Sequence, residues 1–126
     1  DDNVGVILDT FHDQRRAYAF SANPLGIQAD SLQTEGQGAD LSFDALWHSR
    51  GKRTGQGYVV WMAIPFKSLR FPSTSKQTWG IIFNREIPRL NEDTYWPHIS
   101  SRIEGQLNQA GSLEGLENIC RGETFR

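Results

Sequence analysis

In two segments of this chain, successive side chains would point to opposite faces of an extended strand, and the apolar residues follow that period of two. This pattern constrains the fold more than any other feature. Residues 58–64 read Tyr-Val-Val-Trp-Met-Ala-Ile, so both faces of an extended strand would be apolar, as in a central strand. Residues 79–87 read Trp-Gly-Ile-Ile-Phe-Asn-Arg-Glu-Ile. One face carries Trp79, Ile81, Phe83, Arg85 and Ile87, and the other carries Gly80, Ile82, Asn84 and Glu86. The period predicts two strands, and the second is less uniformly buried.

Shorter candidate strands precede these two and are separated by clusters of Gly, Pro, Asn, Asp and Ser. Residues 4–8, 17–22 and 27–32 are predicted strands, with a turn at Asn-Pro-Leu-Gly (23–26) between the last two. Residues 34–40 are predicted as a loop, 43–48 as a short strand and 66–69 as a single helical turn after Pro65. No segment shows the spacing of three and four that a stable helix needs, so the sequence predicts an all-β antiparallel sandwich with at most short helical turns.

Length and charge exclude several classes of protein. A chain of 126 residues is the size of one domain, so we expect residues 1–126 to form a single β-sandwich with one core. Thirteen Lys and Arg against 15 Asp and Glu give a net charge of −2, without the basic run that nucleic-acid binding requires. No apolar stretch approaches the roughly 20 residues of a membrane helix, so we expect no direct membrane insertion. Cys120 is alone, which excludes an internal disulfide.

Several motifs then point to one family. The most specific is Met-Ala-Ile-Pro-Phe-Lys-Ser-Leu-Arg-Phe-Pro at 62–72, supported by Asp-Asp-Asn-Val at 1–4, Leu-Asp-Thr-Phe-His-Asp at 8–13 and Tyr-Trp-Pro at 95–97. With these motifs the chain resembles the family 9 carbohydrate-binding domains over nearly its whole length, in the version found at the front of large bacterial outer-membrane-associated proteins of unknown function. The resemblance implies a jelly-roll-like sandwich, sugar binding through aromatic side chains, structural calcium, and a secreted, periplasmic or cell-surface location.

The chain departs from that family in two places. Family domains usually carry strands ahead of the Asp-Asp-x-Val segment, whereas this sequence begins there. An unpaired apolar edge invites pairing, so we predict that a second copy covers it in a homodimer. The second departure is Trp61, which stands where many family members have Glu, so a role for that Glu cannot be carried over.

Aromatic side chains are the first candidates for a site that binds a polysaccharide or oligosaccharide. Aromatic faces bind the C–H patches of sugars, while amides, carboxylates and guanidinium groups recognise the hydroxyls. Trp47 and Trp96 lie near polar loops, Trp61 could face either way, and Trp79 shares a face with apolar neighbours that makes a place in the core more probable than a platform. The predicted sugar-binding residues are Trp47, Trp61, Asn84, Arg85, Glu92, Tyr95 and Trp96.

Acidic residues near the first strand are the candidate calcium ligands. Asp1, Asp2, Asp9 and Asp13 offer carboxylate oxygens on or beside that strand, although no EF-hand spacing is present. Solvated acids and turn caps explain them equally simply. No pair of carboxylates is marked out for glycoside hydrolysis, there is no Gly-x-Ser-x-Gly elbow, and the three His residues are far apart, so we predict no catalytic residues.

These observations rank three functions. The first is a non-catalytic carbohydrate-binding module. The second is a structural or interaction domain of a larger surface or outer-membrane protein that does not bind sugar. The third is a small glycoside hydrolase, for which the sequence offers the least support.

Overall fold

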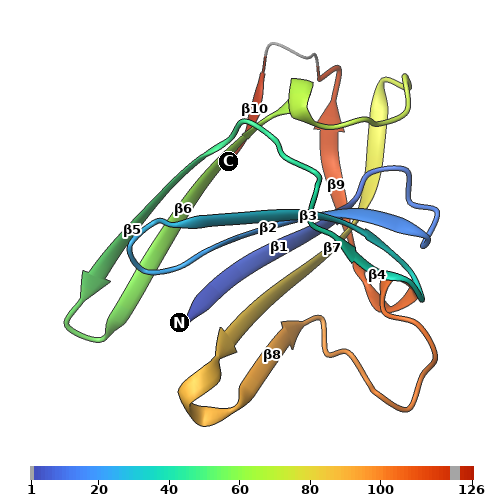
Figure 1. The fold of residues 1–126 in the computed structure, drawn as a ribbon. Helices are drawn as coiled ribbons and strands as arrows, with labels where there is room; N and C mark the ends of the chain where they lie inside the picture. The colour runs from blue at the N-terminus through green and yellow to red at the C-terminus, as the bar shows by residue number, and fades with distance from the viewer. Residues whose placement is uncertain (1, 120–122) are drawn as a thin grey trace.

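A computed structural model describes residues 2–119 and 123–126 and confirms the antiparallel all-β sandwich with only short helical turns (Figure 1). The strands are β1 (Asn3–Asp9), β2 (Arg16–Ala22), β3 (Gln28–Thr34), β4 (Gly38–Asp40), β5 (His48–Thr54), β6 (Gly57–Pro65), β7 (Lys76–Ile87), β8 (Glu92–Trp96), β9 (Gly111–Glu117) and β10 (Thr124–Phe125). Single 3₁₀ turns are η1 (Phe66–Ser68), η2 (Pro88–Leu90) and η3 (Leu107–Gln109). Within the described residues, no helix has the length and apolar character needed to cross a lipid bilayer.

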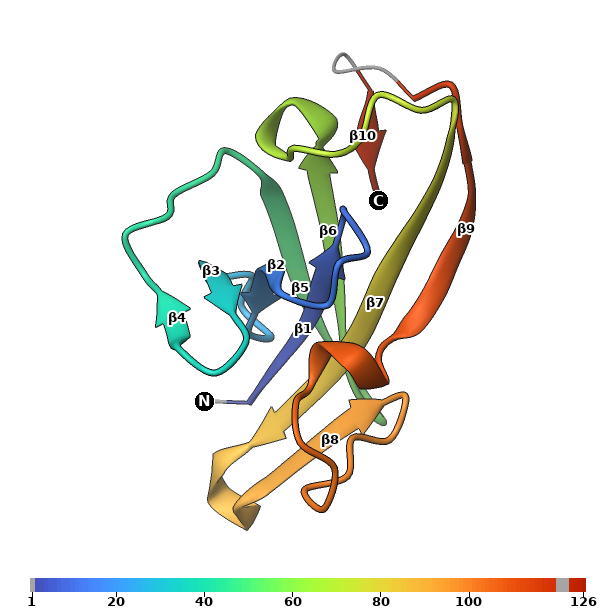
Figure 2. The same ribbon diagram turned by 90° about the vertical axis from the view of Figure 1, so that its right-hand side faces the viewer.

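The larger sheet has seven strands built around the long strand β7. Its main path runs β4-β3-β2-β1-β7-β8, and β9 also pairs with β7. Strand β9 pairs with the first half of β7 and β8 with the second half, so these two strands follow one another along the same edge (Figure 2). Strand β1 lies on the other edge of β7 in an antiparallel ladder from Asn3↔Glu86 to Asp9↔Gly80.

The smaller sheet has three strands in the order β10-β6-β5. Strand β5 pairs with residues 57–63 of β6 along its whole length. Strand β10 is two residues long and pairs only with Ile64 and Pro65, at the end of β6. Residues 57–63 of β6 therefore have a paired edge on the β5 side and, among the described residues, no strand on the other.

The main core lies between the inner faces of the two sheets. Trp79 is fully buried there, and its ring packs edge-on against Phe66 and at a tilt against Phe71 and Phe125. Its indole N–H donates to the side-chain oxygen of Gln77 at 3.0 Å, which satisfies the one polar atom of the ring. The prediction that Trp79 belongs to the core is confirmed. The buried members of this cluster are Val6, Leu8, Phe20, Trp47, Ile64, Phe66, Leu69, Trp79 and Ile81.

A second, smaller cluster covers part of the other face of the larger sheet. Ile7 and Ile82 are opposite one another in the β1–β7 ladder, and Leu107 from η3 packs on them together with Ala17. Partly buried Tyr95 also belongs here. This cluster covers only one end of that face, so the rest of the face stays accessible.

Three predictions about individual strands were wrong. Residues 43–48 do not form a strand: β5 begins only at His48, and its polar sequence His-Ser-Arg-Gly-Lys-Arg-Thr carries no apolar alternation that would reveal it. Residues 34–40, predicted as a loop, contain the short strand β4. Strand β6 is not covered on both faces, because its outward-facing Val59 and Trp61 are 59% and 42% exposed.

Candidate functional site

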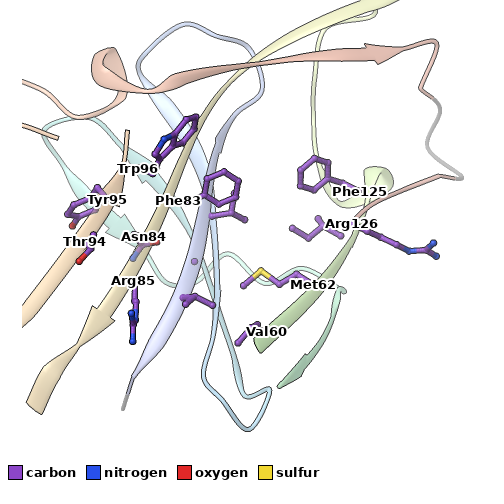
Figure 3. Close-up of a pocket in the computed structure, with 14 residues that line it drawn as sticks. Val60, Met62, Phe83, Asn84, Arg85, Thr94, Tyr95, Trp96, Phe125 and Arg126 are labelled. Carbon is purple, nitrogen blue, oxygen red and sulfur yellow. The ribbon is translucent and has the colours of Figure 1, made fainter. Parts of the chain in front are cut away.

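An apolar groove opens between the two sheets (Figure 3). Its volume is about 530 Å³. Strand alternation places one side chain in two from each lining strand on its wall. The larger sheet contributes Val4, Val6, Phe83, Arg85, Thr94 and Trp96, and the smaller sheet contributes Val60, Met62, Ile64 and Phe125, with Arg126 beside them.

Two aromatic rings form the exposed part of the groove wall. Phe83 and Trp96 are directly opposite one another in the β7–β8 ladder, so both side chains point to the same face. Their ring centroids are 5.9 Å apart, and the rings are 48% and 59% exposed. Figure 3 shows them lying together, with Met62 and Phe125 across the groove. Large apolar rings exposed as a pair inside a groove are typical of a binding surface.

Arg85 connects the two sheets at the far end of the groove. Its Cζ atom lies 5.9 Å from the centre of the Tyr58 ring on β6, a cation–π distance. Arg85 and Arg126 are the charged residues of the groove lining, so the groove carries positive charge and no described acid. The Tyr58 hydroxyl is buried without a hydrogen-bond partner in the described part of the chain.

A second groove crosses the opposite face of the larger sheet. It spans β3, β2, β1, β7 and β8, and its volume is about 410 Å³. Its character is polar, because the outward-facing positions of these strands carry amides, hydroxyls and a carboxylate. The polar side chains that line it from this face are Asn3, Ser21, Ser31, Gln33, Asn84, Glu86, Tyr95 and Gln106.

Gly5 gives the side chain of Asn84 room to lie against β1. It lies on β1 between Ser21 of β2 and Asn84 of β7. A Cβ atom at this position would come within 2.6 Å of the Asn84 side-chain oxygen, so the side chain of Asn84 occupies space that any other residue would need. The missing side chain therefore lets Asn84 lie against β1 in the floor of the polar groove.

Several polar groups in this groove have no hydrogen-bond partner among the described residues. In the part of the chain that the structure describes, no hydrogen bond engages the side chains of Ser21, Ser31, Gln33 or Asn84. Asn3 is different, since its amide donates to Glu86 at 3.3 Å. Burial raises the pKa of Tyr95, and the nearby carboxylates of Asp93 and Glu86 raise it further, so the phenol stays protonated and can donate. A ligand rich in hydroxyl groups would find both donors and acceptors here.

The structure separates the seven predicted sugar-binding residues. Asn84 and Tyr95 are paired across β7 and β8 and belong to the lining of both grooves, whereas their neighbours Arg85 and Trp96 line the apolar groove alone. Trp61 is exposed on the outer face of β6, opposite Arg50. Glu92 is paired with Ile87 at the far end of β8 and lines neither groove.

The prediction that Trp47 offers a stacking face is wrong. Its ring is only 3% exposed and packs edge-on against Phe20 in the core. Its indole N–H donates to the carboxylate of Asp30 at 3.1 Å. The polar residues that follow Trp47 in the sequence suggested a loop, but the ring points back between the sheets.

The candidate calcium ligands do not converge. Asp2 precedes β1 and Asp9 ends it, so about 23 Å of extended chain separates them. Asp9 and Asp13 act as turn caps: the N–H groups of Asp13 and Gln14 donate to Asp9, and those of Arg15 and Arg16 donate to Asp13. No group of three or more His, Cys, Asp or Glu within residues 2–119 and 123–126 is placed to hold a metal ion. A single site formed by all four acids was therefore a wrong prediction, and Asp1 lies outside the described residues.

Sequence reasoning missed the polar groups that complete the second groove. Ser31, Gln33 and Gln106 come from segments with no apolar periodicity, and only the order of the strands brings them near Asn84. Phe83 was assigned to an apolar face, which is correct, but its exposure depends on the opening between the sheets.

No family model matches the chain, and comparison with curated proteins and with solved structures also found no match.

Proposed function

We propose that this chain is a non-catalytic carbohydrate-binding module and that it binds a glycan along the polar groove. The observation that carries the proposal is a set of amides and hydroxyls without a described hydrogen-bond partner, which β2, β3 and β7 bring together in the groove that Tyr95 also lines. Sugar hydroxyls both donate and accept hydrogen bonds, and side-chain amides match them because they do the same. The ring of Tyr95 provides an aromatic surface next to these groups.

The charge of the polar groove favours neutral glycans over anionic ones. The charged group on this face is Glu86, since the carboxylate of Asp30 accepts from the Ala45 N–H and the Trp47 indole instead. No Lys or Arg is among the described lining residues. A uronic acid or sulfated sugar would therefore meet like charge, and no guanidinium would bind its carboxylate. The groove is also open to solvent along its length, which suits an internal stretch of a chain held with modest affinity.

Titration calorimetry against a panel of soluble glycans tests this proposal. The panel contains neutral glucan, xylan and mannan oligosaccharides, with oligogalacturonate and alginate as anionic members. Asn84→Ala and Tyr95→Ala should each weaken binding of a neutral glycan about tenfold, the loss expected when one hydrogen bond of about 1.4 kcal/mol is removed. Trp61→Ala is the matched control, since Trp61 is an exposed aromatic residue on the other sheet.

Three outcomes would contradict the proposal. A panel without binding would favour the interaction domain, and release of reducing sugar from any panel member would favour the hydrolase. Binding that is lost in Trp61→Ala or Trp96→Ala and kept in Tyr95→Ala would move the sugar site to another surface.

A second candidate function is an interaction domain without sugar binding. The specific observation in its favour is the apolar groove, where Phe83 and Trp96 are exposed and few polar groups are available to a sugar. Apolar grooves of this kind suit protein segments better than oligosaccharides. The glycan panel separates the two candidates, because an interaction domain predicts no binding in any member.

Calcium and an exported location belong to the proposal through the family resemblance. Residues 9–16 are the part of the chain where calcium could bind, because the carboxylates of Asp9 and Asp13 lie in one turn. Thermal unfolding with and without EDTA tests this, and an unchanged melting temperature removes calcium from the proposal. Secretion is tested by following the full-length protein in cell fractions, and a cytoplasmic protein would contradict it.

A further inference from the structure

The unpaired edge of β6 borders the apolar groove, and the two features together define one surface. On the β5 side, the small sheet is held against the larger one: the Ser49 hydroxyl donates to the Gly26 carbonyl at 2.7 Å. Gly51 approaches the β2–β3 turn so closely that a Cβ atom there would meet the Pro24 oxygen at 2.0 Å. On the other side, residues 57–63 offer main-chain N–H and C=O groups to which no described strand is bonded.

Strand β10 demonstrates how a segment sits on this edge. It runs antiparallel to β6 with Phe125 opposite Ile64, and this register turns the Phe125 ring into the groove. In this register Arg126 comes beside residue 63, so the same geometry continued along β6 would place the residues of an added strand opposite 62, 61, 60, 59, 58 and 57. Those opposite Met62, Val60 and Tyr58 would enter the groove, because directly opposite residues share a face.

We propose that the free edge of β6 binds an extended strand of a partner polypeptide, which adds to the small sheet in line with β10 and fills the apolar groove. The partner's chemistry follows from the lining. Alternate residues must be apolar to meet Val60, Met62 and Phe83, and one residue near Arg85 must be acidic. Both charged residues of the lining are Arg, so a strand with an acidic group is favoured over a basic one.

A second copy of this chain fits the same surface less well. In a two-fold pairing of β6 with β6, each strand brings its own β10 and Arg126 to the end of the edge that the other must occupy. Such pairing would satisfy main-chain groups but would add no side chain to the groove beyond those that already line it. A single strand satisfies both the edge and the groove.

The probe is a capped peptide, Val-Thr-Val-Thr-Glu-Thr, which begins opposite Met62, beyond Arg126. It places Val opposite Met62 and Val60 and Glu opposite Tyr58, beside Arg85. Its binding is followed by amide hydrogen exchange measured by NMR. A strand added to an antiparallel edge protects every second amide, so the peptide should slow exchange at alternate residues of 57–63 by at least tenfold. The control peptide has Pro in place of the central Val and cannot form a continuous ladder.

Charge reversal provides the second readout. Arg85→Glu should weaken the Glu peptide at least tenfold and strengthen a peptide with Lys in place of Glu. The matched control is Arg50→Glu, since Arg50 is exposed on the outer face of the same small sheet, opposite Trp61. A variant that binds the Lys peptide more tightly than the Glu peptide must be folded. The reversed preference therefore separates loss of the Arg85 contact from loss of structure.

The proposal is overturned if the alternate amides are not protected at saturating peptide, or if the Pro peptide binds equally well. It is also overturned if light scattering gives a dimer whose 57–63 amides are already protected without peptide, since the edge then belongs to a second copy. Protection by a neutral oligosaccharide instead of the peptide would assign the groove to sugar. None of these outcomes depends on the polar groove, so the proposed glycan site is tested separately.

Discussion

The two ends of the space between the sheets are built from the same strands but differ in how well they are filled. At the closed end, Ile64 of β6 and Trp79 of β7 are 1% and 0% exposed. At the open end, Phe83 of β7, on the same face as Trp79, is 48% exposed. The difference lies in what accompanies β6: β10 and the η1 turn cover the closed end, whereas residues 57–63 have β5 on one edge and no described strand on the other. Burial in this fold therefore depends on neighbouring strands more than on the apolar character of a strand itself.

The largest expected difference between the two ends is in the effect of two tryptophan substitutions on the free energy of unfolding. Trp79→Ala should destabilise the fold by about 3–5 kcal/mol, because it removes a fully buried ring and leaves a cavity among Phe66, Phe71 and Phe125. Trp96→Ala should cost less than about 1 kcal/mol, since that ring is mostly exposed. Urea unfolding measures both, and equal losses would mean that the open end is closed in solution.

A smaller effect is expected from two positions on the same face of β6. Ile64→Ala should reduce the free energy of unfolding by about 2–5 kcal/mol, because Ile64 is buried under β10 and the core. Val60→Ala should cost less than about 1 kcal/mol, because the Val60 side chain borders the open groove. A larger loss for Val60→Ala than for Ile64→Ala would contradict the assignment of the two ends.

Substitution of a buried polar side chain should also reduce the free energy of unfolding more than substitution of a polar side chain in a groove, but the difference should be smaller than for the apolar residues. Gln77 is buried, accepts from the Trp79 indole and donates to the carbonyls of Pro72 and Thr74. Gln77→Met should therefore cost about 1–3 kcal/mol by leaving buried partners unsatisfied. Asn84→Ala, in the polar groove, should stay within about 0.5 kcal/mol of wild type in thermal unfolding, since no described hydrogen bond is lost.

The smallest effect is a pH dependence at Asp9, which ends β1 opposite Gly80. Burial raises the pKa of Asp9 above its ordinary value near 3.8, although backbone N–H groups from Gln14 and Asp13 oppose the shift. Since the folded-state pKa is the higher one, the folded state is favoured while Asp9 is protonated. Its stability falls as pH rises from the unfolded-state pKa through the folded-state pKa. The advantage of wild type over Asp9→Asn should therefore shrink between pH 3 and pH 6 in urea titrations, and growth of that advantage would contradict it.

The strands that could be predicted from the sequence are those whose own side chains form the core. Residues 58–64 and 79–87 alternate, and both are strands, because alternation is the local signature of a sheet with a buried face. The turn at 23–26 was also predictable, since the Asn23 side chain accepts from the N–H groups of Leu25 and Ile27, as Asn does in tight turns. Strands β5 and β8 could not be predicted, because their sequences are polar and only pairing with β6 and β7 makes them strands.

The candidate sites depend on register, which a single sequence does not contain. Asn84 and Tyr95 were predicted to bind the same ligand, and they are indeed paired across β7 and β8. Their neighbours Arg85 and Trp96 were predicted with them but point into the other groove, because adjacent residues of a strand face opposite sides. The sequence therefore grouped side chains from the two faces of one strand pair into a single predicted site.

The pairing of β1 with β7 has a consequence for how this protein folds. Asn3 is bonded in register with Glu86, so the central ladder of the larger sheet joins residues that are synthesised far apart. On the ribosome, β1 to β4 can form local hairpins, but their apolar face must remain uncovered until β6 and β7 have emerged. Contacts between such distant residues place folding in the range of about milliseconds to seconds. During that interval β1 is paired with β2 on one edge only, and a chaperone that binds extended segments would find the other edge of residues 4–8 accessible.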